Sequence, residues 1–218
     1  GSTTAPITAT TYGGNLTILN GNNATTTGVL STGALVVSGM LRVTHNVDTY
    51  STTLDNTTNN TSITVGYLTM GTSGQTARYG IFKPGTGTVT VNGDVTVYAS
   101  DASGDNKIDM TGVATPWTVT GSWTNSDTVI PGNSTVNFTA TTTGKTITSG
   151  TGGFNNITFN NAAGGWTAQD DMPVAGNLTI TAGNFSGSSK TITVAGNWDS
   201  SGGTFTYGTS TVVMTGAN

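Results

Sequence analysis

The chain of 218 residues contains no Cys and no Glu, and charged residues make up only 7% of it. Without Cys, neither a disulfide nor a thiolate zinc site can stabilise the fold, so stability must come from core burial and backbone pairing. The ten acidic residues are all Asp, and with six Lys and Arg the net charge is -4. A protein that binds nucleic acid needs a basic surface against the phosphates, so this balance argues against that class.

Long apolar runs are missing as well, and none approaches the roughly 18 to 20 residues that cross a bilayer. The start of the chain shows no signal peptide, and Gly1-Ser2 is typical of a cloning scar. We therefore expect residues 3–218 to be one segment excised from a longer, exported protein. An extracellular location agrees with a composition that is free of Cys, poor in Lys and rich in Thr, Asn and Gly.

The sequence has an excess of Thr, with 50 residues, together with 32 Gly and 21 Asn. Thr is β-branched and favours strands, whereas Gly and Asn tolerate the positive φ angles of turns. Apolar and polar residues alternate over runs of three to six, and they do not recur at helical spacing. The sequence therefore predicts an all-β protein with many short strands and many turns.

Two short motifs recur along the chain. Gly-Asn-Leu-Thr-Ile occurs at 14–18 and 176–180, and Thr-Val-x-Gly-x-Trp occurs at 118–123 and 193–198. The step from Gly176 to Gly196 is about 20 residues, which is the length of one coil of a parallel β-helix. This step predicts about ten coils and a rod of about 50 Å, at the spacing of paired strands. A pair of tandem β-sandwiches, divided near 112–116, is the alternative architecture.

The segment 176–212 carries a family resemblance. Its runs at 176–183, 190–198 and 203–212 resemble the degenerate repeats of very large bacterial surface proteins, the filamentous-haemagglutinin-like and autotransporter-passenger-like adhesins. The resemblance is good over 118–218, weaker over 14–97 and poor at 49–80. It implies a right-handed parallel β-helix, a β-solenoid, with a structural role as a cell-surface stalk or adhesive fibre and without catalysis.

Partners are predicted from the strand edges. The strand at 211–215 is followed by no polar cap of the kind that closes a solenoid, and open edges pair readily with further strands. The expected partners are the neighbouring coils of a longer chain or copies of this chain associated head to tail, with surface glycans as a further partner. Nucleic acid and membrane insertion are not expected. The less regular stretch 49–80 is interpreted as an insertion or a decayed repeat.

One loop has the spacing of a calcium site. Oxygen ligands fall at alternate positions, with a backbone carbonyl at the seventh, as in EF-hand loops. The candidate ligands are Asp101, Ser103, Asp105, Lys107 through its backbone carbonyl, and Asp109. Asn106 stands where such loops prefer Gly, and Gly112 stands where they need a bidentate acid. The alternative is an ordinary solenoid turn, and no other cofactor is predicted.

Catalysis is not predicted. Asp170 and Asp171 form the only adjacent pair of acids, and some β-helical glycosidases use closely placed Asp residues. Such enzymes also need basic residues and a His near the acids, and the sole His, His45, is far away in the sequence. We expect a solvated turn at the acid pair and an exposed or loop position for His45. A polysaccharide-degrading enzyme is therefore the third choice of function.

A carbohydrate- or ice-binding β-solenoid module is the second choice. Thr-x-Thr pairs would order water if they stacked on one face; they begin at Thr88, Thr118, Thr146, Thr179, Thr191 and Thr204. Because Thr179 and Thr191 are separated by little more than half a coil, we expect them on different faces, and strand propensity explains the pairs. Trp123 and Trp198 occupy matching motif positions and are expected to point inward, whereas Trp117 and Trp166 are candidates for exposure.

Overall fold

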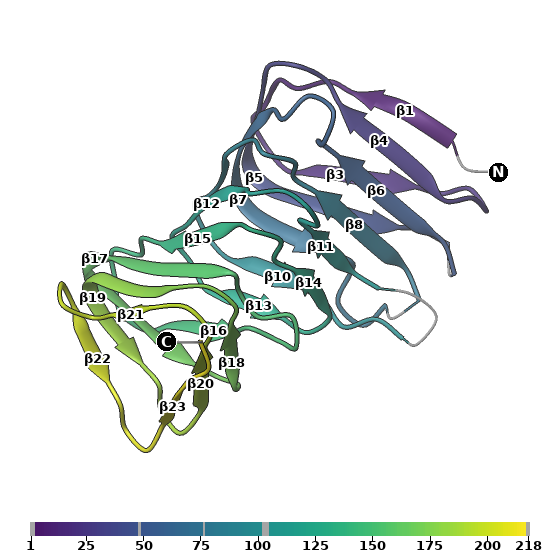
Figure 1. The fold of residues 1–218 in the computed structure, drawn as a ribbon. Coiled ribbons are helices and arrows are strands. Elements are labelled where there is room, and N and C mark those ends of the chain that lie inside the picture. The colour runs from purple at the N-terminus through teal and green to yellow at the C-terminus, as the bar shows by residue number, and fades with distance from the viewer. Residues whose placement is uncertain (1–2, 48, 76, 102–104, 217–218) are drawn as a thin grey trace.

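The protein is a right-handed parallel β-helix of about nine turns in this computed structural model, which describes residues 3–47, 49–75, 77–101 and 105–216. Strands follow one another around three faces, and each coil stacks on the one before it (Figure 1). All pairings between strands of the described residues are parallel. The predicted solenoid is confirmed, and tandem sandwiches, which need antiparallel sheets, are excluded.

Fourteen strands form one sheet that bends around a corner and so covers two of the three faces. The first face contains β2 (Thr11–Tyr12), β9 (Val89–Val91), β12 (Pro116–Val119), β15 (Thr135–Phe138) and β21 (Trp198–Asp199). The second face contains β3 (Leu16–Asn20), β10 (Val95–Val97), β13 (Trp123–Asn125), β16 (Lys145–Thr148) and β22 (Thr204–Thr206). Four longer strands turn the corner and contribute to both faces: β5 (Ala34–His45), β7 (Ser62–Met70), β17 (Asn156–Ala168) and β19 (Leu178–Ser186).

The third face is built from two smaller sheets. The first has β1 (Thr3–Ile7), β4 (Thr26–Leu30), β6 (Ser51–Asp55), β8 (Tyr79–Lys83), β11 (Lys107–Asp109) and β14 (Thr128–Ile130). The second has β18 (Met172–Val174), β20 (Thr191–Val194) and β23 (Thr211–Met214). β6 and β7 lie within 49–80 and pair with their neighbours on both sides, so this stretch forms regular coils despite its poor match to the repeats.

The coils are not of equal length, which is why about nine turns form where a constant step predicts ten. In the middle of the chain Leu68, Val95 and Trp123 stack on one another. Near its end Leu178 and Trp198 stack on one another, and there the step is clearly shorter. The additional residues of the longer coils lie mainly in the connections from the second face to the third, as between β7 and β8 or between β10 and β11.

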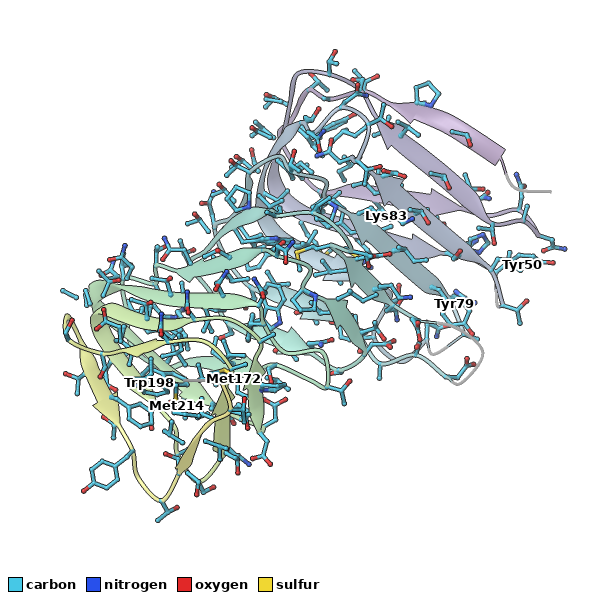
Figure 2. All side chains as sticks on the ribbon, in the orientation of Figure 1. Tyr50, Tyr79, Lys83, Met172, Trp198 and Met214 are labelled. Carbon is cyan, nitrogen blue, oxygen red and sulfur yellow. The ribbon has the colours of Figure 1, made fainter. Side chains whose placement is uncertain are left out.

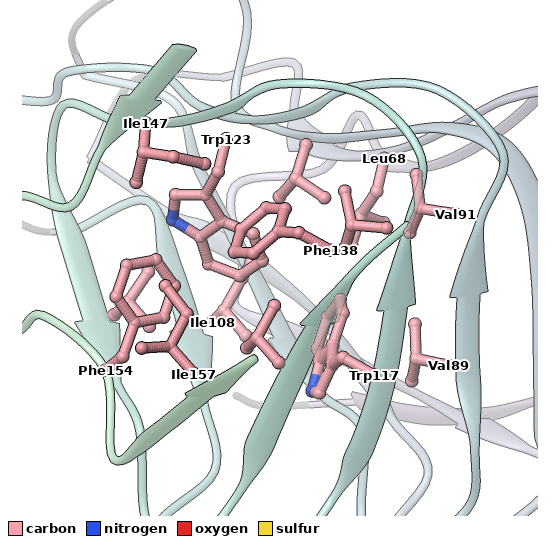
Figure 3. Close-up of a cluster of buried hydrophobic side chains, with 14 of the residues drawn as sticks. Leu68, Val89, Val91, Ile108, Trp117, Trp123, Phe138, Ile147, Phe154 and Ile157 are labelled. Atoms are coloured by element: carbon pink, nitrogen blue, oxygen red, sulfur yellow. The ribbon is translucent and has the colours of Figure 1, made fainter. Parts of the chain in front are cut away.

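The core is filled by columns of inward side chains, because alternate residues of a strand point to opposite sides. On the first face the buried column is Leu35, Ile63, Val89, Trp117, Val136, Ile157 and Leu178. On the second face it is Leu41, Leu68, Val95, Trp123 and Ile147. Figure 3 shows the middle of the core, where side chains from both faces meet.

Aromatic rings form a connected row along this core. The centroids of Trp117 and Trp123 are 5.7 Å apart, and the stacked rings of Phe159 and Phe185 are 4.4 Å apart. Trp117 and Trp166 are only 2% and 1% exposed, so the prediction that either side chain is exposed is wrong. Their size explains the burial, because a large ring gains most from leaving water.

The Thr-Val-x-Gly-x-Trp motif serves two different corners of the solenoid. Trp123 points inward on the second face, beside Val95, whereas Trp198 is partly buried on the first face, beside Leu178. The two copies therefore share a local strand–turn–strand geometry, and they are not equivalent positions of one column. The motif predicts inward packing for both side chains, and this is confirmed.

The Gly of the Thr-Val-x-Gly-x-Trp motif is explained by a close approach between coils. A Cβ atom at Gly121 would collide with the carbonyl oxygen of Gly93, and one at Gly196 would lie 2.5 Å from that of Gly176. Real Cβ atoms do not come so close, so each corner requires a residue without a side chain. The motif is thus a corner motif dictated by stacking.

Candidate functional site

The candidate calcium segment does not form a wrapped loop over its described residues. Lys107 and Asp109 belong to β11, an extended strand paired with β8 and β14, and the carbonyls of such a strand are directed at its neighbours. Asp101 accepts a hydrogen bond from the Tyr79 hydroxyl at 2.6 Å. The Asp105 carboxylate lies 3.1 Å from the Lys107 ammonium. Ser103 lies outside the described residues, so calcium binding stays a prediction.

Asp109 is held in its ionised form by its surroundings. Partial burial raises the pKa of this carboxyl, but hydrogen bonds from the Thr111 hydroxyl and amide, with Lys83 and Lys107 nearby, lower it below its ordinary value. The amide nitrogen of Thr111 is 3.0 Å from the Asp109 Oδ1 atom. Over residues 3–47, 49–75, 77–101 and 105–216, no three His, Cys, Asp or Glu side chains come together as a metal site.

The two adjacent acids, Asp170 and Asp171, point to different coils. Asp170 accepts hydrogen bonds from the backbone amides of Ser149 and Gly150, at 2.8 and 2.7 Å, in the preceding coil. Asp171 accepts one from the amide of Thr191, at 2.8 Å, in the following coil. The acid pair lies between two strands, as predicted, but both carboxylates accept hydrogen bonds from the backbone and are not simply solvated. They also line a surface hollow of about 510 Å³.

This use of polar side chains recurs along the solenoid, and it was not anticipated from the sequence. The Asp94 carboxylate accepts the Ser122 amide at 2.7 Å, one coil further on. The Asn177 side-chain oxygen accepts the backbone amide of Asn197 at 2.8 Å, and the backbone amide of Asn177 donates to the Asn156 side-chain oxygen at 2.9 Å. At Asp94 and Asn177 the signal was present as Gly followed by Asp or Asn before an apolar residue, whereas Asn156, Asp170 and Asp171 do not follow a Gly. We call these contacts inter-coil brackets.

His45 is buried, and the expectation of an exposed or loop position is wrong. The residue is 1% exposed and ends β5 in the second face. Its Nε2 atom lies 3.1 Å from the carbonyl oxygen of Ala24. Its Nδ1 atom lies 3.0 Å from the amide nitrogen and 2.9 Å from the carbonyl oxygen of Val47. Both ring nitrogens thereby lie against backbone groups.

The outward side of the first face carries a ladder of Thr residues. Its members pair in register from coil to coil as Thr11, Val36, Thr64, Thr90, Thr118, Asn137, Thr158, Thr179 and Asp199. Thr179 lies here and Thr191 lies on the third face, so the expectation that these two are on different faces is confirmed. The ladder nonetheless stacks Thr179 with Thr residues of five other coils on one face.

Two further hollows open at the ends of the solenoid. At the C-terminal end a hollow of about 640 Å³ is lined by Trp198, Phe205 and Met214, two of which are labelled in Figure 2. At the N-terminal end a hollow of about 390 Å³ is lined by Ile7, Tyr12 and Leu16. Met214 is 51% exposed. These are inward side chains of the outermost coils, and no described coil covers them.

Comparison with known proteins gives no assignment, since no family model, no curated protein and no solved structure matches the chain. The resemblance to surface adhesins therefore rests on the repeat motifs alone. Within the described residues, no helix has the length and hydropathy needed for a membrane span.

Proposed function

We propose that the chain is a structural segment of an extracellular cell-surface or fibre protein, a stalk or adhesin module without catalysis. The observation that carries the proposal is the use of its acids. Asp94, Asp127, Asp170 and Asp171 each accept a backbone amide of a neighbouring coil at 2.7 to 2.9 Å. A carboxylate occupied in this way stabilises the coil below or above it, and it is poorly placed to act on a substrate.

The interior supports the same role. The buried columns and the row of aromatic rings continue from coil to coil, so each coil is held by apolar contact and by parallel backbone pairing on both sides. In a solenoid, stability is the sum of such nearest-neighbour terms. An arrangement of this kind is suited to transmit load along its axis, as a stalk must do.

The resemblance to filamentous-haemagglutinin-like and autotransporter-passenger-like repeats supports the extracellular location, together with the absence of Cys and the scarcity of charge. Surface glycans remain a proposed partner, and a glycan array is the direct test. Calcium remains a proposed ligand of the segment 101–109.

The end faces suggest a second part of the proposal: they stack against further β-solenoid coils, in a longer chain or in a second copy placed head to tail. Apolar side chains such as Trp198 and Met214 are only partly covered there, and covering them removes apolar surface from water. Among the described residues, each of the end strands pairs on one side only: β1, β2 and β3 at one end, and β21, β22 and β23 at the other.

Small-angle X-ray scattering at several concentrations tests this proposal. A stack of nine turns at about 4.8 Å per turn gives a rod of about 43 Å, and end-to-end association would lengthen it as the concentration rises. Met214→Lys should suppress the lengthening, whereas Thr96→Lys, which adds the same charge on the second face, should not. A length independent of concentration would leave only the coils of a longer chain as neighbours.

The structural role itself has a separate test. We expect no hydrolysis of a panel of plant and bacterial polysaccharides. A hydrolytic activity that Asp170→Asn abolishes would overturn the proposal and identify the hollow beside Asp170 and Asp171 as an active site.

A further inference from the structure

The outward side of the first face has a property that the structural role does not require. Six consecutive coils present the segments 62–66, 88–92, 116–120, 135–139, 156–160 and 177–181. In each segment the second and fourth residues are buried, and the other three face solvent. We call these outward residues the Thr face. It is three positions wide and six coils long; ten of its 18 positions are Thr, and the others are Ser62, Gly66, Pro116 and five Asn.

The Thr face has a regular two-dimensional spacing, except between its last two coils, where a register shift pairs Asn160 with Ala182. Parallel strands lie about 4.8 Å apart, and alternate residues along a strand lie about 6.6 Å apart. The central ladder is in register through all six coils, without a bulge between them. The surface therefore measures about 24 Å along the solenoid and about 13 Å across it.

The hydroxyl groups of this ladder are free to bind an external partner. In the part of the chain that the structure describes, the side chains of Thr64, Thr90, Thr118, Thr158 and Thr179 form no hydrogen bond with another protein group. All five are partly exposed. Each presents one hydroxyl and one methyl group on a β-branched side chain with few rotamers. The array is consequently ordered before any partner binds, which lowers the entropic cost of binding.

Charged and aromatic residues are absent from the outward positions of the Thr face. The other two faces differ in this respect. The second face carries Arg42, and Tyr67 is 53% exposed at its corner. The third face carries Asp55, Lys83 and Asp109 at outward positions. A charged partner therefore finds no complement on the Thr face, and a sugar ring finds no aromatic surface to stack against.

These observations point to a neutral partner that is itself flat and periodic. A small solute needs a concave site to bury its surface, and the Thr face is a sheet surface. A lattice of water molecules supplies hydrogen-bond donors and acceptors at regular positions over an extended plane. We propose that the Thr face binds the surface of ice. This inference is independent of the proposed stalk function, because it uses only the outward residues of one face.

The experiment compares two substitutions within one coil. Thr118 lies at the centre of the Thr face in β12, and Thr124 faces outward on the second face in β13. Both are partly exposed. Purified wild-type chain, Thr118→Tyr and Thr124→Tyr are assayed for thermal hysteresis and for incorporation into a growing shell of polycrystalline ice. We expect Thr118→Tyr to reduce both severalfold and Thr124→Tyr to leave both unchanged.

A third variant predicts a gain. Asn137 interrupts the ladder between Thr118 and Thr158, and its Oδ1 atom is buried without a hydrogen-bond partner. Asn137→Thr should therefore extend the ladder and increase thermal hysteresis. Circular dichroism melting of each variant separates binding from folding, and Thr118→Val, which keeps the shape and removes only the hydroxyl, replaces Thr118→Tyr if the latter unfolds.

The outcomes are distinct. Absence of both hysteresis and ice incorporation in the wild-type chain would overturn the proposal, as would equal losses in Thr118→Tyr and Thr124→Tyr. Retention on microcrystalline cellulose that Thr118→Tyr abolishes, without activity on ice, would overturn it in favour of a crystalline glycan. None of these results bears on the rod shape or on the brackets, so failure here leaves the stalk proposal standing.

Discussion

Replacing Asp170 by Ala should destabilise the protein more than the same change at the adjacent Asp171. Asp170 accepts two backbone amides, those of Ser149 and Gly150, and Ser149 is fully buried. A hydrogen bond to a charged group contributes about 1.5 to 3 kcal/mol. Because water reaches part of this turn, the lower half of that range applies to each of the two bonds, and Asp170→Ala should cost about 3 to 4.5 kcal/mol of unfolding free energy.

Two further variants should destabilise the protein less than Asp170→Ala does. Asp170→Asn keeps one acceptor oxygen and turns an amino group toward the second amide, so its cost should be about 1 to 2 kcal/mol. Asp171 is exposed and accepts only the Thr191 amide, so Asp171→Ala should cost about 0.5 to 1 kcal/mol. The expected order of destabilisation is Asp170→Ala, then Asp170→Asn, then Asp171→Ala.

Urea unfolding followed by Trp fluorescence measures these costs. All four Trp residues lie between positions 117 and 198, so the signal reports the half of the solenoid that contains the brackets of Asp170 and Asp171. Far-ultraviolet circular dichroism gives an independent measure over the whole chain. If Asp171→Ala costs as much as Asp170→Ala, or if Asp170→Ala stays within about 0.5 kcal/mol of wild type, the inter-coil brackets do not stabilise the fold.

Acidification, truncation of aromatic rings and added calcium give three other predictions. The pKa of Asp109 is lowered in the fold, so its contribution to stability is present above the unfolded pKa and is lost as the pH falls through the folded pKa. The difference in Tm between wild type and Asp109→Asn should therefore close on acidification from pH 5. A constant difference would contradict the hydrogen bonds from Thr111. Phe159 lies in the buried row of rings, so Phe159→Ala should lower the unfolding free energy in urea by about 3 to 5 kcal/mol. Phe205 is partly buried in the last coil, so Phe205→Ala should lower it by only about 1 to 2 kcal/mol. Equal costs would refute the end position of Phe205. If 101–109 binds calcium, millimolar calcium should raise the Tm and Asp105→Asn should abolish that rise, whereas an unchanged wild-type Tm would remove the site.

The fold class was readable from the sequence because it depends on local patterns. Alternation of apolar and polar residues assigns the two sides of each strand, as at Leu178 and Ile180, and this needs no knowledge of neighbours. Gly and Asn between the strands mark the turns. The short repeat step between Gly176 and Gly196 then favours stacked coils over a sandwich, and the parallel pairing bears this out.

The sequence did not show which residues occupy equivalent positions in successive coils. Leu16 and Leu178 follow the same Gly-Asn dipeptide, yet Leu16 pairs with Leu41 on the second face and Leu178 pairs with Ile157 on the first. One corner geometry is used at two corners, so sequence similarity does not identify the face. The unequal lengths of the coils shift the register further, because a constant step along the chain does not return to the same column.

The roles of the polar residues were decided by the tertiary structure. An Asp in a turn is solvated in the absence of a neighbour, but stacking brings the amides of Ser149 and Gly150 against Asp170, and a buried amide must find an acceptor. His45 is buried against the carbonyl of Ala24 and the ring of Tyr50, and the stacked Thr ladder exists only once the coils are in register. By itself, the sequence determined the strands, the turns and the inward side of each strand, because these depend on residues close together in the chain. Only the stacking of coils decided which residues meet, because that depends on contacts between residues a full coil apart in the chain.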